Sequence, residues 1–133
     1  MARSLMYVER CIGADHDGEA YIGYVEQSKT GRTIYFNDVG LSRVTRGGVM
    51  GNYVNVENGE EYWVSGVKKR GTNRHWAGSG KVAIERPAVA EYLELTGQTE
   101  VDSSLFEVVE PFAQTDRERI HKVLHDPLYD EEA

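Results

Sequence analysis

The sequence NYVNVENGEEYWVS, at residues 52–65, decides the fold because it reads as two short strands around a tight turn. Asn58-Gly59 is the strongest hairpin signal in the chain, since a type I′ turn needs positive φ at both central positions. A two-residue loop places Val54 opposite Trp63. The stretch therefore predicts an antiparallel hairpin.

Side chains alternate across a strand, so both faces of this hairpin carry bulky apolar residues. One face has Val54, Val56 and Trp63, and the other has Tyr53, Tyr62 and Val64. Such a ribbon is either buried on both sides or presents aromatic side chains to a partner.

Short runs rich in aromatic and β-branched residues surround the hairpin and predict further strands. They cover residues 4–12, 20–27, 32–36, 41–44 and 81–85, with 105–109 as an edge strand. Many short strands with tight turns predict a mainly β (α+β) fold: a small curled antiparallel sheet or a partial barrel.

Two C-terminal helices are predicted to cover this sheet. Residues 87–95 begin with proline and stop before Gly97, which suits the two ends of a helix. Residues 116–125 follow Thr115, and Glu118 three residues later completes a capping box. The apolar stripes are Val89, Tyr92 and Leu93 in the first helix and Ile120, Val123 and Leu124 in the second.

The 133 residues fit one domain, with a β-rich core at 1–85 and a helical acidic part at 86–133 packed on it. Residues 1–80 hold 10 Lys/Arg and 9 Asp/Glu, whereas residues 81–133 hold 5 and 13. The chain has no apolar run of about 20 residues and no secretory signal at its start. A single cysteine, Cys11, suits a reducing compartment. We therefore expect a cytoplasmic protein that is not attached to a membrane.

The motifs that bind metals are incomplete. Residues 15–26, DHDGEAYIGYVE, match an EF-hand loop at four places, but Ala20 stands where the loop needs glycine. A hairpin tip is the favoured interpretation. His121 and His125 share a helix face, yet zinc takes three or four ligands, so two solvated histidines are favoured. We predict no metal and no cofactor.

No catalytic residue is predicted. Cys11 lies in a strand pattern without a family signature around it, where a buried, inert thiol is usual. The glycine-rich residues 43–52 lack the GK[ST] ending of a phosphate loop and precede a strand. We interpret them as a connection before the hairpin.

The stretch VKKRGTNRHWAGSGK, at residues 67–81, is the candidate binding site because it holds five cations and no acid. Cations attract phosphates, and an aromatic ring stacks on a base or an arginine. The predicted binding residues are Lys68, Lys69, Arg70, Arg74 and Trp76, with Tyr62 as a further stacking residue. Two alternatives stay open: a solvated loop with Trp76 folded back, and neutralisation by the acidic C-terminal part.

The run GNYVNVENGEEYWVSGVKKRGTNRHW, residues 51–76, resembles a group of small uncharacterised bacterial proteins. Their shared pattern is GN-[YH]-x-x-V-x-x-GEEYW-[VI]-SG-x-KK, followed by a basic polar loop, a short strand and an acidic helix. The group has no established function, so the resemblance assigns no functional residue.

Three functions fit the sequence. The first is a non-enzymatic binding module whose basic aromatic loop engages nucleic acid or an acidic protein surface. The second is an enzyme of unrecognised type with a pocket at the barrel end and His75 or His16 as base. The third is a regulatory subunit that docks through an acidic arm at residues 116–132.

Overall fold

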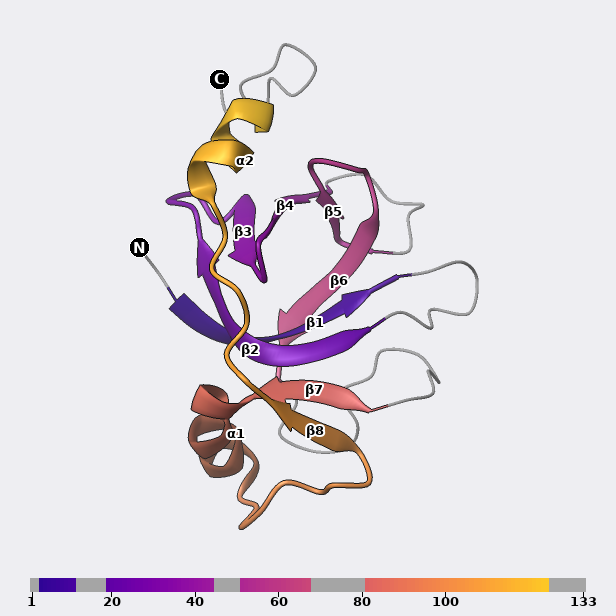
Figure 1. Cartoon of the computed structure of the whole chain (residues 1–133), viewed down its shortest axis with the longest axis vertical. Coiled ribbons are helices and arrows are strands. Elements are labelled where there is room, and N and C mark those ends of the chain that lie inside the picture. The colour runs from indigo at the N-terminus through magenta and orange to yellow at the C-terminus, as the bar shows by residue number, and fades with distance from the viewer. Residues whose placement is uncertain (1–2, 12–18, 45–50, 68–80, 125–133) are drawn as a thin grey trace.

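The computed structural model describes residues 3–11, 19–44, 51–67 and 81–124 (Figure 1). Its elements are β1 (Arg3–Arg10), β2 (Ala20–Gln27), β3 (Thr33–Phe36), β4 (Val39–Arg43), β5 (Tyr53–Asn55), β6 (Glu61–Gly66), β7 (Val82–Glu85), η1 (Arg86–Ala88), α1 (Val89–Thr96), β8 (Phe106–Val109) and α2 (Arg117–Leu124). Every predicted strand and helix occurs within two residues of its expected ends, so the mostly β class is confirmed.

Strands β1 to β6 form a closed antiparallel barrel, which corrects the prediction of a curled sheet or partial barrel. The order around it is β1, β6, β5, β4, β3, β2 and back to β1. It closes because β1 pairs along both edges, so that Val8 lies opposite Tyr21 of β2 and Val64 of β6. A row of local strand signals does not reveal this pairing of the first strand with the sixth.

The β5–β6 hairpin has a longer turn than its Asn-Gly pair predicts. Tyr53 lies opposite Tyr62 rather than Val64, and the N–H of Asn55 bonds to the carbonyl of Glu60 at 2.8 Å. Only Gly59 has positive φ, at 77°. The predicted register is therefore wrong by two residues, a shift that leaves each side chain on its predicted face.

A two-residue turn of the kind expected at Asn58-Gly59 lies instead between β3 and β4. Asn37 and Asp38 have φ of 49° and 63°, and the flanking Phe36 and Val39 are paired. Both residue types tolerate this left-handed conformation better than most. The turn directs Asp38 toward α2.

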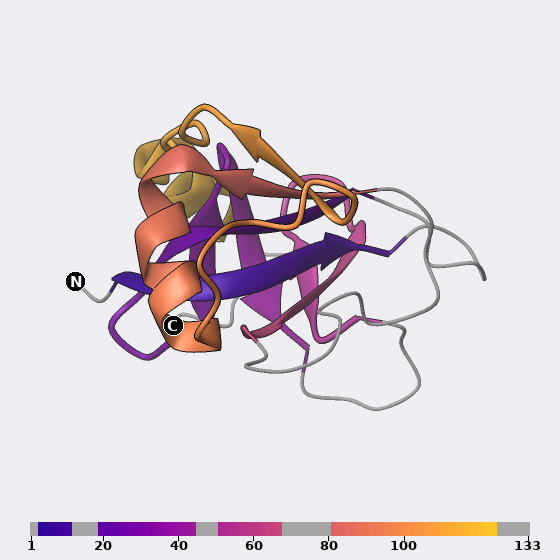
Figure 2. The same cartoon turned by 90° about the horizontal axis from the view of Figure 1, so that it is seen from below.

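The barrel is filled by inward-facing side chains. The core cluster is Val8, Val25, Ile34, Phe36, Leu41, Tyr53, Tyr62 and Val64. A second cluster joins the outer face of β1 and β2 to β7, α1 and β8, and the view from below shows these elements side by side (Figure 2). Tyr92 of α1 and Phe106 of β8 pack there with ring centroids 5.3 Å apart.

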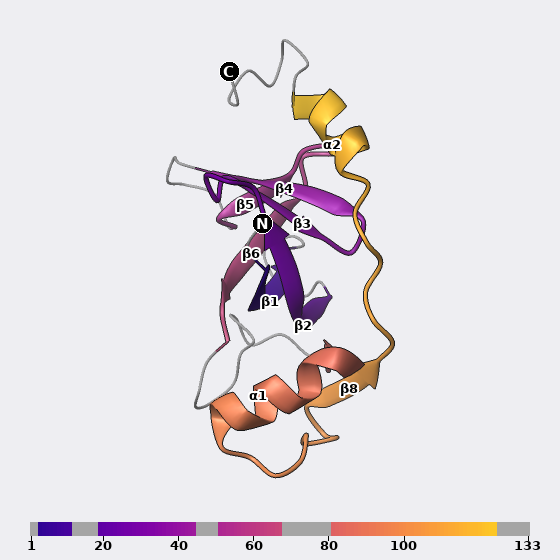
Figure 3. The same cartoon turned by 90° about the vertical axis from the view of Figure 1, so that its left-hand side faces the viewer.

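Residues 110–116, called here the strap, run from β8 along the outside of the barrel to α2 (Figure 3). Within the strap, Ala113 N–H donates to the Asn37 side chain at 3.3 Å, and the Thr115 hydroxyl donates to the carbonyl of Val39 at 3.2 Å. Beyond it, α2 buries Ile120 and Leu124 against the barrel. The strap and α2 thus belong to the same packed body as the strands.

Candidate functional site

Most of the predicted binding residues lie outside the described residues. These are Lys68, Lys69, Arg70, Arg74 and Trp76. The sixth, Tyr62, is only 8% exposed because its ring belongs to the barrel interior. Burial also raises the pKa of its phenol to about 12, with Glu60 as a further cause. The prediction that Tyr62 stacks on a partner is therefore wrong.

Barrel topology places the starts of three separate connections at one end. Neighbouring strands are antiparallel all around the barrel, so β2, β4 and β6 finish at the same end. The connections that leave from there are residues 28–32, 44–52 and 67–81. The first two return to the barrel at the same end. The last leads to β7, which runs parallel to β2 and therefore begins at the opposite end, where Ala83 pairs with Tyr21 of β2.

The sequences of these connections share one charge sign. They contain no Asp or Glu. Their Lys and Arg residues are Lys29, Arg32, Arg46, Lys68, Lys69, Arg70 and Arg74, together with Lys81, which lies at the opposite end because it directly precedes β7. We call this end of the barrel the basic end. Adjacent cations without acids repel one another, so they favour an anion brought from outside.

The connections at the other end have the opposite composition. Residues 11–19, 37–38 and 56–60 contain no Lys or Arg, and their acids are Asp15, Asp17, Glu19, Asp38, Glu57 and Glu60. We call this the acidic end. Among the described residues of the connections between barrel strands, Lys29 and Arg32 therefore lie at one end and Glu19, Asp38, Glu57 and Glu60 at the other, which neither the net charge nor the division at residue 80 reveals.

The described part of the basic end contains three exposed cations, Lys29, Arg32 and Arg43. The N–H of Arg43 donates to the carbonyl of Arg32 at 2.9 Å, which makes the two arginines cross-strand neighbours. The Arg43 guanidinium lies 5.9 Å from the ring centroid of Tyr53, and the Tyr53 hydroxyl donates to the carbonyl of Gly31 at 3.4 Å. These contacts tie β4, β5 and the β2–β3 turn together.

The described acids of the acidic end have partners on neighbouring elements. Arg10, the last residue of β1, pairs with Glu19 at 3.3 Å and also with Glu60. Arg119 of α2 pairs with both Asp38 and Glu57 at 3.0 Å. The guanidinium of Arg119 lowers the pKa of Asp38, as Arg10 lowers the pKa of Glu60. The described C-terminal part thus offers cations to the barrel.

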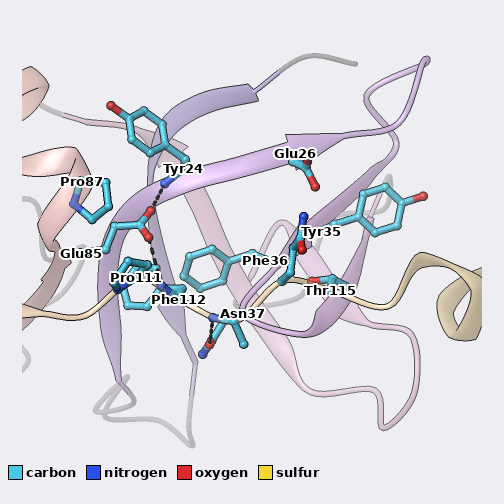
Figure 4. Close-up of a pocket in the computed structure, with 12 residues that line it drawn as sticks. Tyr24, Glu26, Tyr35, Phe36, Asn37, Glu85, Pro87, Pro111, Phe112 and Thr115 are labelled. Carbon is cyan, nitrogen blue, oxygen red and sulfur yellow. Dashed lines mark hydrogen bonds between the residues drawn. The ribbon is translucent and has the colours of Figure 1, made fainter.

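A pocket of about 230 Å³ lies between β2, the β3–β4 turn and the strap (Figure 4). Two carboxylates line it, those of Glu26 and Glu85, and none of its lining residues is Lys, Arg or His. Prolines and aromatic residues form the remaining walls together with the amides of Asn37 and Gln114. The pocket combines an apolar wall with two acids, of which Glu26 pairs with Arg117 of α2 and Glu85 forms none of the ion pairs within the described residues.

Glu85 fills a place where the barrel edge changes partner. The outer edge of β2 pairs with β7 as far as Ile22 and with β3 from Glu26 onward. Between them, the N–H of Tyr24 donates to Oε2 of Glu85 at 2.7 Å, and the N–H of Phe112 donates to Oε1 at 3.0 Å. The carboxylate, 5% exposed as a residue, therefore joins β7, β2 and the strap.

The ring of Phe112 enters the barrel at the same gap. It packs edge-on against Tyr21 and Phe36, with centroids 5.4 and 5.0 Å away. A Cβ on Gly23 would lie 2.6 Å from both this ring and Oε2 of Glu85. The packing of Phe112 of the strap therefore requires a residue without a side chain at position 23. No motif in the sequence points to Glu85 or Phe112, because the contacts join segments far apart in the chain.

The other candidate groups give no further site among the described residues. Cys11 is buried, which raises the pKa of its thiol to about 11, with Glu9 and Glu61 adding to the effect. His121 Nε2 lies 3.1 Å from the Tyr35 hydroxyl. The described residues contain no group of three or more metal-binding side chains and no helix suited to crossing a membrane.

Several sequence predictions fall outside the described residues. They concern His16, His75, His125 and the first four residues of the EF-hand-like segment, residues 15–18, whereas residues 20–26 of that segment belong to β2.

Comparison with protein-family models, with curated proteins and with solved structures finds no match to this chain. The resemblance to the small bacterial group therefore stays a prediction.

Proposed function

We propose that the protein is a cytoplasmic binding module that engages single-stranded nucleic acid at the basic end of its barrel. The observation that carries the proposal is that three acid-free connections leave a closed barrel from the same end, and that their sequences hold seven Lys and Arg residues besides Lys81, which lies next to β7. Such a set suits a polyanion better than a small anion, because many weak phosphate contacts then add.

The net charge of −7 does not oppose this proposal once the charges are placed. The acids gather at the opposite end and in the C-terminal part, and fields of exposed charges fade over a Debye length of about 8 Å at physiological salt. A phosphate approaching the basic end therefore meets the local positive potential rather than the average of the molecule.

Each predicted residue has a separate role. Lys68, Lys69, Arg70 and Arg74 supply charge, and we add Lys29, Arg32 and Arg43 from the described basic end. Trp76 supplies a stacking surface for a base. The barrel interior is filled by its own side chains, so the partner contacts connections and strand ends.

The test is the salt dependence of binding to a fluorescent single-stranded oligonucleotide. We expect saturable binding that weakens with salt, and a slope of log K against log [salt] that falls when Lys68, Lys69 and Arg70 are together changed to Ala. The matched control is Lys122→Ala, which removes an exposed cation of α2.

Two outcomes oppose the proposal. Absence of oligonucleotide binding at low salt would refute the nucleic-acid partner. Equal binding of polyglutamate and of an oligonucleotide of the same charge, both lost in the triple variant, would assign the basic end to an acidic protein surface.

A further inference from the structure

We propose that the pocket under the strap binds a small organic cation, a guanidinium or ammonium group, between Glu85 and Glu26. This proposal goes beyond the nucleic-acid function and does not depend on it. It concerns a different surface and a ligand of opposite charge.

The first observation is a buried carboxylate without a counter-charge. Glu85 is 5% exposed, and its two oxygens each accept one backbone N–H. None of the ion pairs formed within the described residues includes Glu85. A carboxylate has about four acceptor positions, so two remain for a ligand. Burying a charge that is not paired is costly, and a cation in the adjacent pocket removes that cost.

The second observation is the composition of the walls. Glu26 adds a second carboxylate at the rim, whereas no cation lines the pocket. In Figure 4 the two carboxylates lie on either side of the space, Glu85 next to Pro87 and Glu26 above Tyr35. The aromatic and proline walls accept the alkyl part of an amine, and at the lower edge of the pocket the amide oxygen of Asn37 accepts the N–H of Ala113 of the strap.

The third observation is a cation that the chain itself supplies at the rim. Arg117 of α2 pairs with Glu26 at 3.2 Å, and its guanidinium lies 4.4 Å from the centroid of the Tyr35 ring. Glu26 and Tyr35 both line the pocket. The protein thus already uses one carboxylate and one aromatic ring of this pocket to hold a guanidinium, the arrangement typical of cation recognition.

The volume limits the ligand. About 230 Å³ accommodates a guanidinium or ammonium group with a short alkyl chain. That is the size of the end of an arginine or lysine side chain or of a free alkylamine. A ligand that reaches Glu26 competes with Arg117.

The test titrates ¹⁵N-labelled protein with butylguanidinium and, separately, with butylurea, its uncharged counterpart. The amide signals of Tyr24 and Phe112 report directly, because both N–H groups donate to Glu85. We expect both signals to shift saturably with butylguanidinium and to stay still with butylurea.

Substitutions locate the site. Glu85→Gln and Glu26→Gln should each weaken binding, by about tenfold for the buried group. Arg117→Gln removes the internal competitor and should tighten binding by about twofold to fivefold. Glu107→Gln, an exposed acid of β8 that does not line the pocket, is the matched control and should bind as the original chain does.

The proposal is overturned if butylurea shifts the two amides as butylguanidinium does, or if Glu26→Gln leaves the affinity unchanged. If Glu85→Gln fails to fold, these two results still test the proposal. Glu26 lies at the exposed rim, so its substitution leaves Glu85 in place at the gap in the barrel edge.

Discussion

Gly40 of β4 lies directly beneath Ile120 of α2. A Cβ on Gly40 would lie 2.5 Å from Cγ2 of Ile120, closer than non-bonded carbon atoms approach. Ile120 has no exposed surface, and it packs there with Tyr35, Val56 and Leu124. The absence of a side chain at residue 40 is therefore what allows α2 to rest on the barrel.

The first prediction is that Gly40→Ala destabilises the protein by about 1–3 kcal/mol, the usual cost of overpacking a filled core. Denaturant unfolding measures the change. Ile120→Val in the Gly40→Ala background should recover part of the loss, because it removes a methyl group near the new Cβ. Gly66→Ala is the matched control, since a Cβ there meets nothing within 4 Å. Equal effects of the two glycine substitutions would contradict the packing argument.

The second prediction concerns the start of α2. The sequence predicts Thr115 and Glu118 as a capping box, but Oδ1 of Asp116 accepts the N–H groups of Glu118 and Arg119, at 3.1 and 3.2 Å. Asp116→Ala should therefore cost about 0.5–2 kcal/mol of unfolding free energy.

Thr115→Ala separates the two caps. Its hydroxyl donates to the carbonyl of Val39, so its loss removes one hydrogen bond between strap and barrel rather than a helix cap. Circular dichroism should then show reduced helix content in Asp116→Ala alone. Loss of helix in Thr115→Ala instead would restore the capping box.

The third prediction follows from the ion pair of Asp38 with Arg119. The hydrogen bond from Arg119 lowers the folded-state pKa of Asp38, with the N–H of Asp116 as a further cause. The stabilisation from this pair is therefore present above the unfolded pKa of about 4 and is lost as pH falls through the folded pKa. NMR titration of the carboxyl carbon should show the Asp38 pKa rising toward its ordinary value in Arg119→Gln.

Asp102 provides the control for this titration. Its pKa is also lowered, but by hydrogen bonds from Ser104 rather than by an arginine. It should titrate identically in the original chain and in Arg119→Gln. If Asp38 too is unchanged by the substitution, the pairing of α2 with the turn is refuted.

Local signals in the sequence predicted the strands and helices, because alternation and helix-end residues act over a few positions. The pairing of β1 with β6 depends on residues more than 50 positions apart, so no local signal predicted closure. The Asn58-Gly59 turn failed for a similar reason. Val56 is buried against Ile120 and Leu124 of α2, which lie far away in the sequence, and the longer turn places Val56 in that contact.

The candidate site was likewise predictable only where local sequence features determine it. The charge of residues 67–81 was evident from composition, whereas the strand directions were needed to show that this connection leaves the barrel from the same end as residues 28–32 and 44–52. Tyr62 was misjudged because a hairpin apolar on both faces fits two environments, and only closure of the barrel selects burial. In the sequence, Glu85 resembles an ordinary residue at a strand end. Its role depends on the gap along β2, where its carboxylate accepts hydrogen bonds from the N–H groups of Tyr24 and Phe112.

The fourth prediction tests the described part of the basic end. Arg43 is exposed, and its guanidinium lies near the ring of the buried Tyr53, so the chain holds it at the barrel end without an ion pair within the described residues. Arg43→Gln should weaken oligonucleotide binding about equally for different base sequences. It should also reduce the slope of log K against log [salt] by about 0.7, the value for one phosphate contact on a single strand. Arg86→Gln, at an exposed arginine paired with Glu110, is the matched control and should leave the slope unchanged. A slope unaltered in Arg43→Gln would place the nucleic acid elsewhere, because a cation that touches a phosphate cannot be removed without changing the number of counterions released.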